Sequence, residues 1–298
     1  MKTIADLRSQ DELVQQDFSY ADLPHLDLIN HNLQHSNFSR ANLRWSNLSG
    51  ADLTGANLSS ADLSHARLIG ANLSGADLSR ADLTGADLSW VNFQGATLNY
   101  ATLSGANLNQ ANLSGIDLSG ANLQNASLKG INLTGAQLNR ANLSGANLTN
   151  ANLAGASLNK ADLRRSNLKK SNLQKAVLQR ADLTQANLRG ANLGGAVLRD
   201  IKLSEFTLSE LHRQTLDSNI NLQLADLQGA DLSGAILIGA SLRCALLVDA
   251  NLTQMSLQGA HLVDAMLGNA DLRQANLQNS ILSKVTLTEA IMPDGSVR

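Results

Sequence analysis

Leucine or another large apolar residue recurs at every fifth position along most of the chain. From Phe18 to Leu208 a step of five meets 39 residues, of which 36 are leucine and three are phenylalanine. A second series runs from Leu222 to Met292 and holds 14 leucines in 15 positions. The residue two places before each leucine is usually alanine, the residue just before it is usually asparagine or aspartate, and the two that follow are mostly polar or glycine. The chain therefore consists largely of five-residue units that read Ala-(Asn/Asp)-Leu-x-x.

This spacing fits neither a regular helix nor a straight strand. On an α-helix five residues advance by about 500°, so successive leucines would lie about 140° apart and form no apolar stripe. On a strand, an odd spacing sends successive leucines to opposite faces. The pattern is satisfied when the chain turns a corner once in each unit, because the alanine and the leucine then both point inward from one short side. We therefore predict a solenoid of stacked coils.

Longer periods indicate how many sides make one coil. Glycine stands at the second position after leucine every twenty residues from Gly55 to Gly195, and Lys175 is the single exception. Asparagine or aspartate stands just before leucine at the same interval from Asn32 to Asn192. A chemistry that repeats every twenty residues predicts four sides of five residues, so each coil is expected to be square.

The repeated units resemble the pentapeptide repeat family over roughly residues 18–292. That resemblance implies an all-β solenoid, a right-handed quadrilateral β-helix, and the 54 units would make about 13 coils. The closing turn Ile291-Met292-Pro293-Asp294-Gly295 is similar to the terminus of cyanobacterial members, including regulators of heterocyst development. The resemblance is specific for the fold. It does not by itself specify the function, because one fold can serve many functions.

The pattern divides the chain into five parts. Residues 3–16 combine apolar residues with a capping box, Ser9-x-x-Glu12, and predict a short helix that covers the first coil. Phe18 and Phe38 are twenty residues apart, so their rings are expected to stack beneath this cap. The parts are a helical cap at 1–17, a β-helix at 18–208, a break at 209–220, a continued β-helix at 221–292 and a tail at 293–298.

The break interrupts the five-residue rhythm. Fourteen residues separate Leu208 from Leu222, one fewer than three units require. Either one side lacks a residue, or residues 209–220 bulge from the coil as a loop. Irregular insertions in repeat arrays are often functional, so His212 and Arg213 are candidate partner contacts, with a plain bulge as the alternative.

Composition excludes several classes of function. The 298 residues carry a net charge of −2, only 3% of them are aromatic, and one is cysteine. A single cysteine excludes a disulfide framework and any multi-cysteine metal site. No apolar run is long enough to span a membrane, and the N-terminus lacks a signal-peptide core, so we expect no membrane partner and a cytoplasmic location. The six histidines suggest no convergent ligand set and no catalytic constellation is evident, so we expect no cofactor, no metal and no enzymatic activity.

All tryptophans and tyrosines occupy the second position after leucine, which points outward. Exposed tryptophan and tyrosine side chains are typical anchors of protein interfaces. The alternative is that they only pack against neighbouring corners of the solenoid. The four candidate contacts are Tyr20, Trp45, Trp90 and Tyr100.

Charge and apolar residues give two further candidate surfaces. Nine basic residues and only two aspartates lie between Lys160 and Arg199, which predicts a basic girdle around all four sides; its candidate contacts are Lys169, Lys170, Lys175 and Arg180. The girdle could meet phosphate or an acidic protein surface, but without interleaved aromatics a nucleic acid partner is disfavoured. The second series has outward apolar residues that favour docking or a homodimer through the C-terminal region: Leu246, Val248 and Met266 on one side, with Ile236 and Ile238 opposite. A solvated basic face and scattered apolar residues are the alternatives.

The sequence therefore favours a non-enzymatic scaffold that presents the faces of a rigid β-helix to an unidentified protein partner. The family resemblance implies a role in cyanobacterial regulation or differentiation. It also implies an alternative, because some members resemble B-DNA and protect or inhibit gyrase. The aspartates that would form such an acidic surface are sparse here, and the basic girdle interrupts them; they are Asp62, Asp77, Asp82, Asp87 and Asp117.

Overall fold

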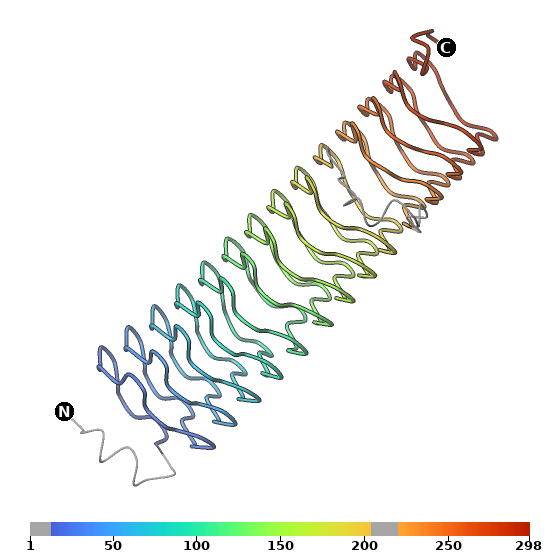
Figure 1. Ribbon diagram of the computed structural model, residues 1–298. Coiled ribbons are helices and arrows are strands. Elements are labelled where there is room, and N and C mark those ends of the chain that lie inside the picture. The colour runs from blue at the N-terminus through green and yellow to red at the C-terminus, as the bar shows by residue number, and fades with distance from the viewer. Residues whose placement is uncertain (1–12, 204–219) are drawn as a thin grey trace, which may run out of the picture. The chain divides into compact units, whose positions relative to one another are not determined.

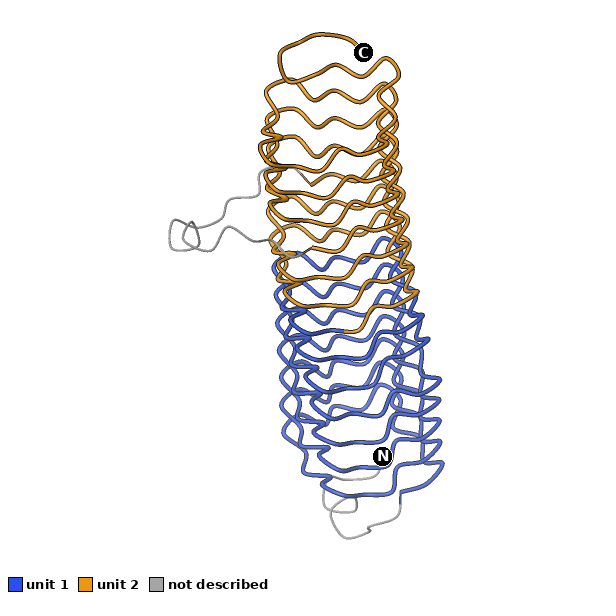
Figure 2. Cartoon of the chain, turned by 90° about the vertical axis from the view of Figure 1, so that its right-hand side faces the viewer, with its two compact units in different colours: residues 1–151 blue, residues 152–298 orange. Residues whose placement is uncertain are grey.

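The computed structural model describes residues 13–203 and 220–298. The chain divides into two compact units, residues 1–151 and residues 152–298, which are shown in different colours in Figure 2. In each unit the backbone turns through successive coils that lie one above the next (Figure 1). The two units are described separately below.

Parallel bridges between residues twenty apart define the coil in both units. In the first unit Asp17 pairs with Asn37 and Asn37 with Asn57, and in the second unit Asn152 pairs with Asn172. Each bridging residue is the one just before a core leucine or phenylalanine. One bridge on each side is too short to make a strand of several residues, and the described ranges contain no helix. The predicted β-helix with four five-residue sides in each regular coil is confirmed.

Leucine and alanine fill the interior of both units. In the coils away from the ends, the core leucines and the alanines two residues before them are almost completely buried. Burial of each leucine contributes about 1.5–3 kcal/mol before conformational entropy is subtracted. Serine replaces alanine at Ser36 and Ser166, and both are buried. The Ser36 Oγ donates to the carbonyl oxygen of Leu13 at 2.6 Å, whereas the Ser166 Oγ has no hydrogen-bond partner among the described residues. Most positions beside the leucines hold alanine or serine, but larger apolar residues are also buried there, such as Leu26, Ile131 and Met255.

The corner follows from the two residues after leucine. The second of them has a positive φ, for example 58° at Tyr20 and 65° at Gly85, which lies in the left-handed region. The first donates its main-chain N–H to the side-chain oxygen two residues back, as Ser19 does to Asp17 Oδ1 at 3.0 Å. This asparagine or aspartate turn explains why an Asn or Asp so often precedes the core leucine.

Asparagine side chains also connect successive coils. The Asn92 Nδ2 donates to the Asn72 Oδ1 at 3.0 Å, one coil below. At Asp52 this ladder contains a carboxylate instead, which accepts hydrogen bonds from Gln34 Nε2 at 2.6 Å and Asn72 Nδ2 at 3.4 Å. Burial alone would raise the pKa of Asp52, but hydrogen bonds from Thr54, Gln34 and Asn72 lower it below its ordinary value.

Corner side chains lean toward the corner one coil further along. A Cβ placed on Gly85 would lie 2.6 Å from the His65 Nδ1, and one placed on Gly120 would lie 2.8 Å from the Tyr100 ring. By contrast, Gly105, in the same column as Gly85, has no heavy atom within 4 Å of such a Cβ. A large corner residue thus requires glycine, or a side chain that can stack on it, twenty residues later.

The N-terminal cap differs in part from the prediction. Residues 3–12 lie outside the described residues, but residues 13–16 are not helical. Leu13 is buried and its N–H donates to the Asn32 carbonyl oxygen at 2.7 Å, because Leu13 stands five residues before Phe18 and continues the repeat. The described β-helix therefore begins at residue 13, before the predicted boundary at 17. The expected stack of Phe18 on Phe38 is confirmed, with ring centroids 4.9 Å apart.

The break in the second unit is an insertion. Asn192 pairs with Asn221 and Lys202 with Asp231, in both cases 29 residues apart rather than 20. The coil that contains the break therefore has nine extra residues, which decides between the two alternatives left open by the sequence. Residues 204–219, which include the predicted loop up to 219, lie outside the described residues.

The C-terminal end of the second unit is only partly covered. Ile291 pairs antiparallel with Val297, so the last residues fold back over one side of the last coil, where Ala290 is fully buried. The other sides of that coil have no such cover among the described residues, and the core residue Leu282 is 36% exposed.

The glycine rule at the corners can be tested with a matched pair. We expect Gly105→Ala to lower the free energy of unfolding by about 1–2 kcal/mol, because alanine must then adopt a positive φ. Gly85→Ala, at nearly the same φ, should cost about 1 kcal/mol more, because the new Cβ displaces the His65 ring. Urea unfolding followed by circular dichroism measures both. Equal losses for the two variants would contradict the rule.

The hydrogen bonds of Asp52 predict a pH-dependent effect. The lowered pKa of Asp52 means that its contribution to stability is present above its ordinary value of 3.8 and is lost as the pH falls through its folded-state value. We expect Gln34→Ala to lower the free energy of unfolding by about 1 kcal/mol at neutral pH and by much less at a pH below the folded-state pKa of Asp52, where the carboxyl is protonated. Gln94→Ala, in the same column, is the control. An equal loss at both pH values would refute this account.

Candidate functional site

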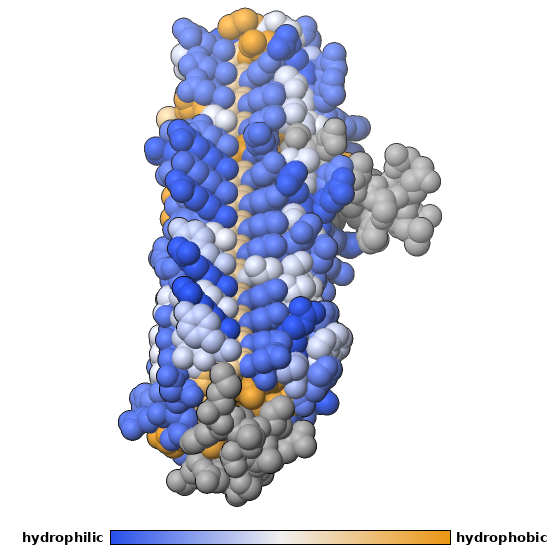
Figure 3. Space-filling model, turned by 90° about the vertical axis from the view of Figure 1, so that its left-hand side faces the viewer, coloured by the Kyte–Doolittle hydropathy of each residue, from blue (hydrophilic) through white to orange (hydrophobic). Residues whose placement is uncertain are grey.

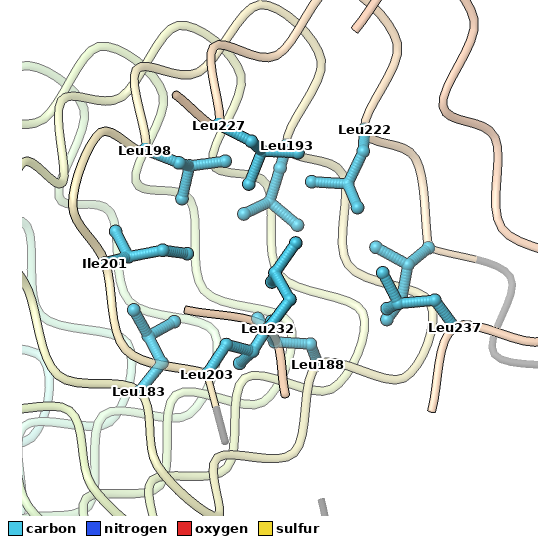
Figure 4. Close-up of a pocket in the computed structure, with 11 residues that line it drawn as sticks. Leu183, Leu188, Leu193, Leu198, Ile201, Leu203, Leu222, Leu227, Leu232 and Leu237 are labelled. Atoms are coloured by element: carbon cyan, nitrogen blue, oxygen red, sulfur yellow. The ribbon is translucent and has the colours of Figure 1, made fainter. Parts of the chain in front are cut away.

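The cavity that core leucines line in the second unit is too small for a substrate. The cavity in the second unit measures about 10 Å³, which is at most the space of one water molecule. Its lining consists entirely of leucine and isoleucine side chains that point toward one another (Figure 4). The described residues also contain no cluster of three metal-ligating side chains. The outer faces carry the polar, charged and aromatic groups that can recognise another molecule. Hydrophilic side chains predominate on the face shown in Figure 3.

The four aromatic candidates are all exposed and all stand at corners with positive φ. They do not share one corner. Tyr20 and Tyr100 belong to one column of corners, while Trp45 and Trp90 each belong to a different one, because their positions differ within the 20-residue period. The sequence predicted their exposure, and the coil decides which of them are neighbours.

Tyr20 and Trp45 flank a single face of the first unit. Arg40 stands one coil above Tyr20, with its Nη1 donating to the tyrosine hydroxyl at 2.8 Å and its guanidinium 5.4 Å from the ring centroid. Trp45 stacks on His65, with ring centroids 4.3 Å apart and planes 13° apart. Arg44 lies on the side between these two corners. We call these five residues, Tyr20, Arg40, Arg44, Trp45 and His65, the aromatic–arginine face.

Corner packing therefore holds these side chains without burying them. Trp45 remains 53% exposed and Tyr20 68% exposed despite their partners. Arg44 is held by Asp62, with its Nη1 3.4 Å from the Asp62 Oδ2. The two alternatives in the sequence, corner packing or partner contact, are thus compatible, because the packed rings still present a free surface. Arg40, Arg44 and His65 were not among the predicted partner contacts. The 20-residue period does place Arg40 in the column of Tyr20 and His65 in the column of Trp45.

Trp90 and Tyr100 lie apart from this face. Both are more than 60% exposed, and the Tyr100 ring lies beside Gly120. Neither has a stacked ring or a nearby guanidinium among the described residues. They provide an internal comparison for the role of the stacked pairs.

Ion pairs neutralise three of the nine basic residues of the predicted girdle. Three of its arginines pair with carboxylates: Arg164 with Asp162, Arg180 with Asp200 and Arg199 with Asp226. The hydrogen bonds from Arg164 lower the pKa of the Asp162 carboxyl below its ordinary value. Lys169, Lys170 and Lys175 form no ion pair within the described ranges. Basic residues without an ion pair in the described ranges therefore remain at all four corners of the coil, at Lys160, Arg165, Lys170 and Lys175.

The apolar candidates of the second unit lie on one side, as expected. Leu246 pairs with Met266 in the ladder, and Val248 follows on the same side. Only Met266 is fully in the exposed class, at 44%, while Leu246 and Val248 are half-buried. The sequence analysis missed Leu224, which is 62% exposed because it takes a corner position that usually holds a polar residue or glycine. His212 and Arg213 lie outside the described residues.

No helix in the described part of the chain is long and apolar enough to cross a membrane. A comparison with curated proteins finds no match. The family model for pentapeptide repeats matches residues 17–200, 218–254 and 256–292.

Solved structures give further relatives. HetL, a pentapeptide repeat protein involved in heterocyst differentiation regulation from the cyanobacterium Nostoc sp. strain PCC 7120, is 34% identical, with 89% of this chain and 92% of HetL covered and a TM-score of 0.38. Rfr23 from the cyanobacterium Cyanothece 51142 is 28% identical over 51% of this chain and 90% of its own, with a TM-score of 0.19. QnrB1, a plasmid-mediated fluoroquinolone resistance protein, is 17% identical over 73% of this chain and 91% of its own, with a TM-score of 0.28. The match to the family model and the identity with HetL show that the chain belongs to the pentapeptide repeat family.

Proposed function

We propose that this protein is a non-enzymatic scaffold that binds a protein partner through the aromatic–arginine face of its first unit. The observation that carries the proposal is the pair of stacked corners, Tyr20 with Arg40 and Trp45 with His65, on either side of Arg44. Tryptophan, tyrosine and arginine are the residues most enriched among interface hot spots. No other side of the described residues combines all three.

The stacked arrangement also favours binding on energetic grounds. Ordering a long side chain at an interface costs about 0.5–1.5 kcal/mol. Arg40 is already held by the Tyr20 hydroxyl, and Trp45 by the His65 ring, so part of this ordering precedes the encounter. The exposed ring surfaces supply apolar area, and Arg44 supplies polar donors between them.

The regulatory role stated for HetL is the one we assign to this chain, together with the expected cytoplasmic location. The alternative, a gyrase-binding DNA mimic, draws less support from the geometry. Asp62 is paired with Arg44, and Arg67 adjoins Asp87 in the ladder, so basic groups interrupt the carboxylates of the first unit. A DNA mimic would instead need continuous negative charge.

The proposal predicts that two aromatic double variants behave differently. Tyr20→Ala/Trp45→Ala should reduce partner capture from the native cell by about tenfold or more, because both anchors of one face are lost. Trp90→Ala/Tyr100→Ala removes the same residue types from separate corners and should leave capture unchanged. Capture is measured by photo-crosslinking from a probe residue introduced at Asp22, which is exposed on the same side, and by mass spectrometry of the products.

Circular dichroism of both variants provides the control for folding. If both double variants lose the same partners, or if neither does, the aromatic–arginine face is not the binding surface.

The C-terminal end of the second unit supports the homodimer expected from the sequence, and we propose that two copies meet there. Earlier core leucines donate their N–H to the coil above, as Leu257 does to Asn276 at 2.8 Å. The N–H groups of Leu277, Leu282 and Leu287 have no main-chain partner among the described residues. Their side chains are also partly exposed, and apolar atoms are visible at this end in Figure 3. A second copy could accept hydrogen bonds from these N–H groups and cover the exposed leucine side chains at once.

A single charge placed inside or outside the last coil tests this dimer. Leu282→Asp should convert the protein to a monomer, because a carboxylate would be buried at the contact. Ser283→Asp adds the same charge on the outside of the same coil and should leave the dimer intact. Sedimentation velocity measures the mass of each. A wild-type monomer at high micromolar concentration, or dimers of both variants, would contradict the proposal.

A further inference from the structure

Four basic residues gather on one side of the second unit. Asn167 and Asn187 are bridged one coil apart and mark this side, and Lys169 and Arg189 follow them on it. Arg165 and Lys170 stand at the two corners of the lower of these coils, both with a φ of 57°. We call Arg165, Lys169, Lys170 and Arg189 the basic face.

This side gathers more uncompensated charge than the rest of the girdle, where Lys160 and Lys175 are the other basic residues without an ion pair in the described ranges. None of the four residues forms an ion pair within the described ranges, whereas Arg164, Arg180 and Arg199, on other sides, all do. The Nε of Arg165 donates to the Gln185 Oε1 at 2.9 Å, which holds the guanidinium while four of its five N–H donors remain available. The basic face thus presents four cations without a carboxylate partner in the described ranges, and one of them, Arg165, is held by a hydrogen bond.

The geometry favours carboxylates on a compact surface. Lys169 and Arg189 belong to coils that lie about 4.8 Å apart, so the cations form two closely spaced rows on a flat side. Residues 221–298, which follow the insertion, carry seven acidic and four basic side chains. A long polyanion that ran along the coils would meet this opposing charge, whereas an acidic patch that ends with the basic face would not.

Nucleic acid fits the same side less well. The described residues of the second unit contain no aromatic side chain on which a base could stack. Four free cations also offer fewer phosphate contacts than the six to ten that are typical of tight DNA binders.

We propose that the basic face docks a compact acidic patch of a protein partner. This contact is in addition to the one made by the aromatic–arginine face. This inference rests on the proposed scaffold function but on different residues in a different unit. It also predicts a distinct physical signature, because contacts between exposed charges weaken as salt rises.

A labelled hexaglutamate peptide serves as the probe, and its binding to the full chain is followed by fluorescence anisotropy at low salt. We expect Lys169→Gln/Lys170→Gln/Arg189→Gln to weaken binding by about tenfold or more. The matched control, Arg164→Gln/Arg180→Gln/Arg199→Gln, removes the same number of charges from ion-paired positions and should change binding less than about twofold.

Three outcomes would overturn the inference: no binding of hexaglutamate at low salt, equal losses for the two triple variants, or tighter binding of a short DNA duplex that depends on the same three residues. Tyr20→Ala/Trp45→Ala should bind the peptide like the wild-type chain. The peptide experiment therefore separates this inference from the proposed function, whose own test is partner capture by the first unit.

Discussion

The structure depends on the register between coils, which the narrow apolar interior enforces. Each core leucine packs beside an alanine from the same side, while main-chain hydrogen bonds such as Leu23 N–H to Asn42 carbonyl oxygen connect one coil to the next. A coil with one residue more or fewer would rotate every leucine out of the interior. Nine additional residues lie between Asn192 and Asn221, and the coils that follow keep the same register.

This register converts sequence distance into surface position. Residues twenty apart become neighbours, so side chains that are remote in the sequence form columns along a face. At the corners the effect is strongest, because the left-handed conformation directs one side chain over the next corner. For this reason the Trp45 ring stacks on His65 in the coil above, and the His65 ring reaches toward Gly85 in the next coil. The same geometry brings Arg40 to Tyr20. The fold thus fixes exposed aromatic and basic groups in place without a pocket.

The two proposed surfaces use different interactions. The aromatic–arginine face of the first unit combines ring surfaces with an arginine that Asp62 holds, so its contribution comes mainly from apolar area and geometry. The basic face of the second unit has free charge and no aromatic neighbour among the described residues, so its contribution is electrostatic and depends on salt. A scaffold with both can gain affinity from one surface and orientation from the other.

The sequence alone determined the four-sided coil, the leucine interior and the exposure of Tyr20, Trp45, Trp90 and Tyr100, because a five-residue period leaves a single geometry that keeps every leucine inside. It also left two accounts of the break open and extended the predicted N-terminal helix over residues 13–16, which are not helical in the structure. Only the tertiary structure showed that the break is an insertion, that Arg44 joins Tyr20 and Trp45 on one face, and that Lys169 and Arg189 remain uncompensated while Arg199 does not. The first of these facts depends on which residues pair between coils, and the others depend on which side chains are in contact. A pattern of residue types does not contain that information.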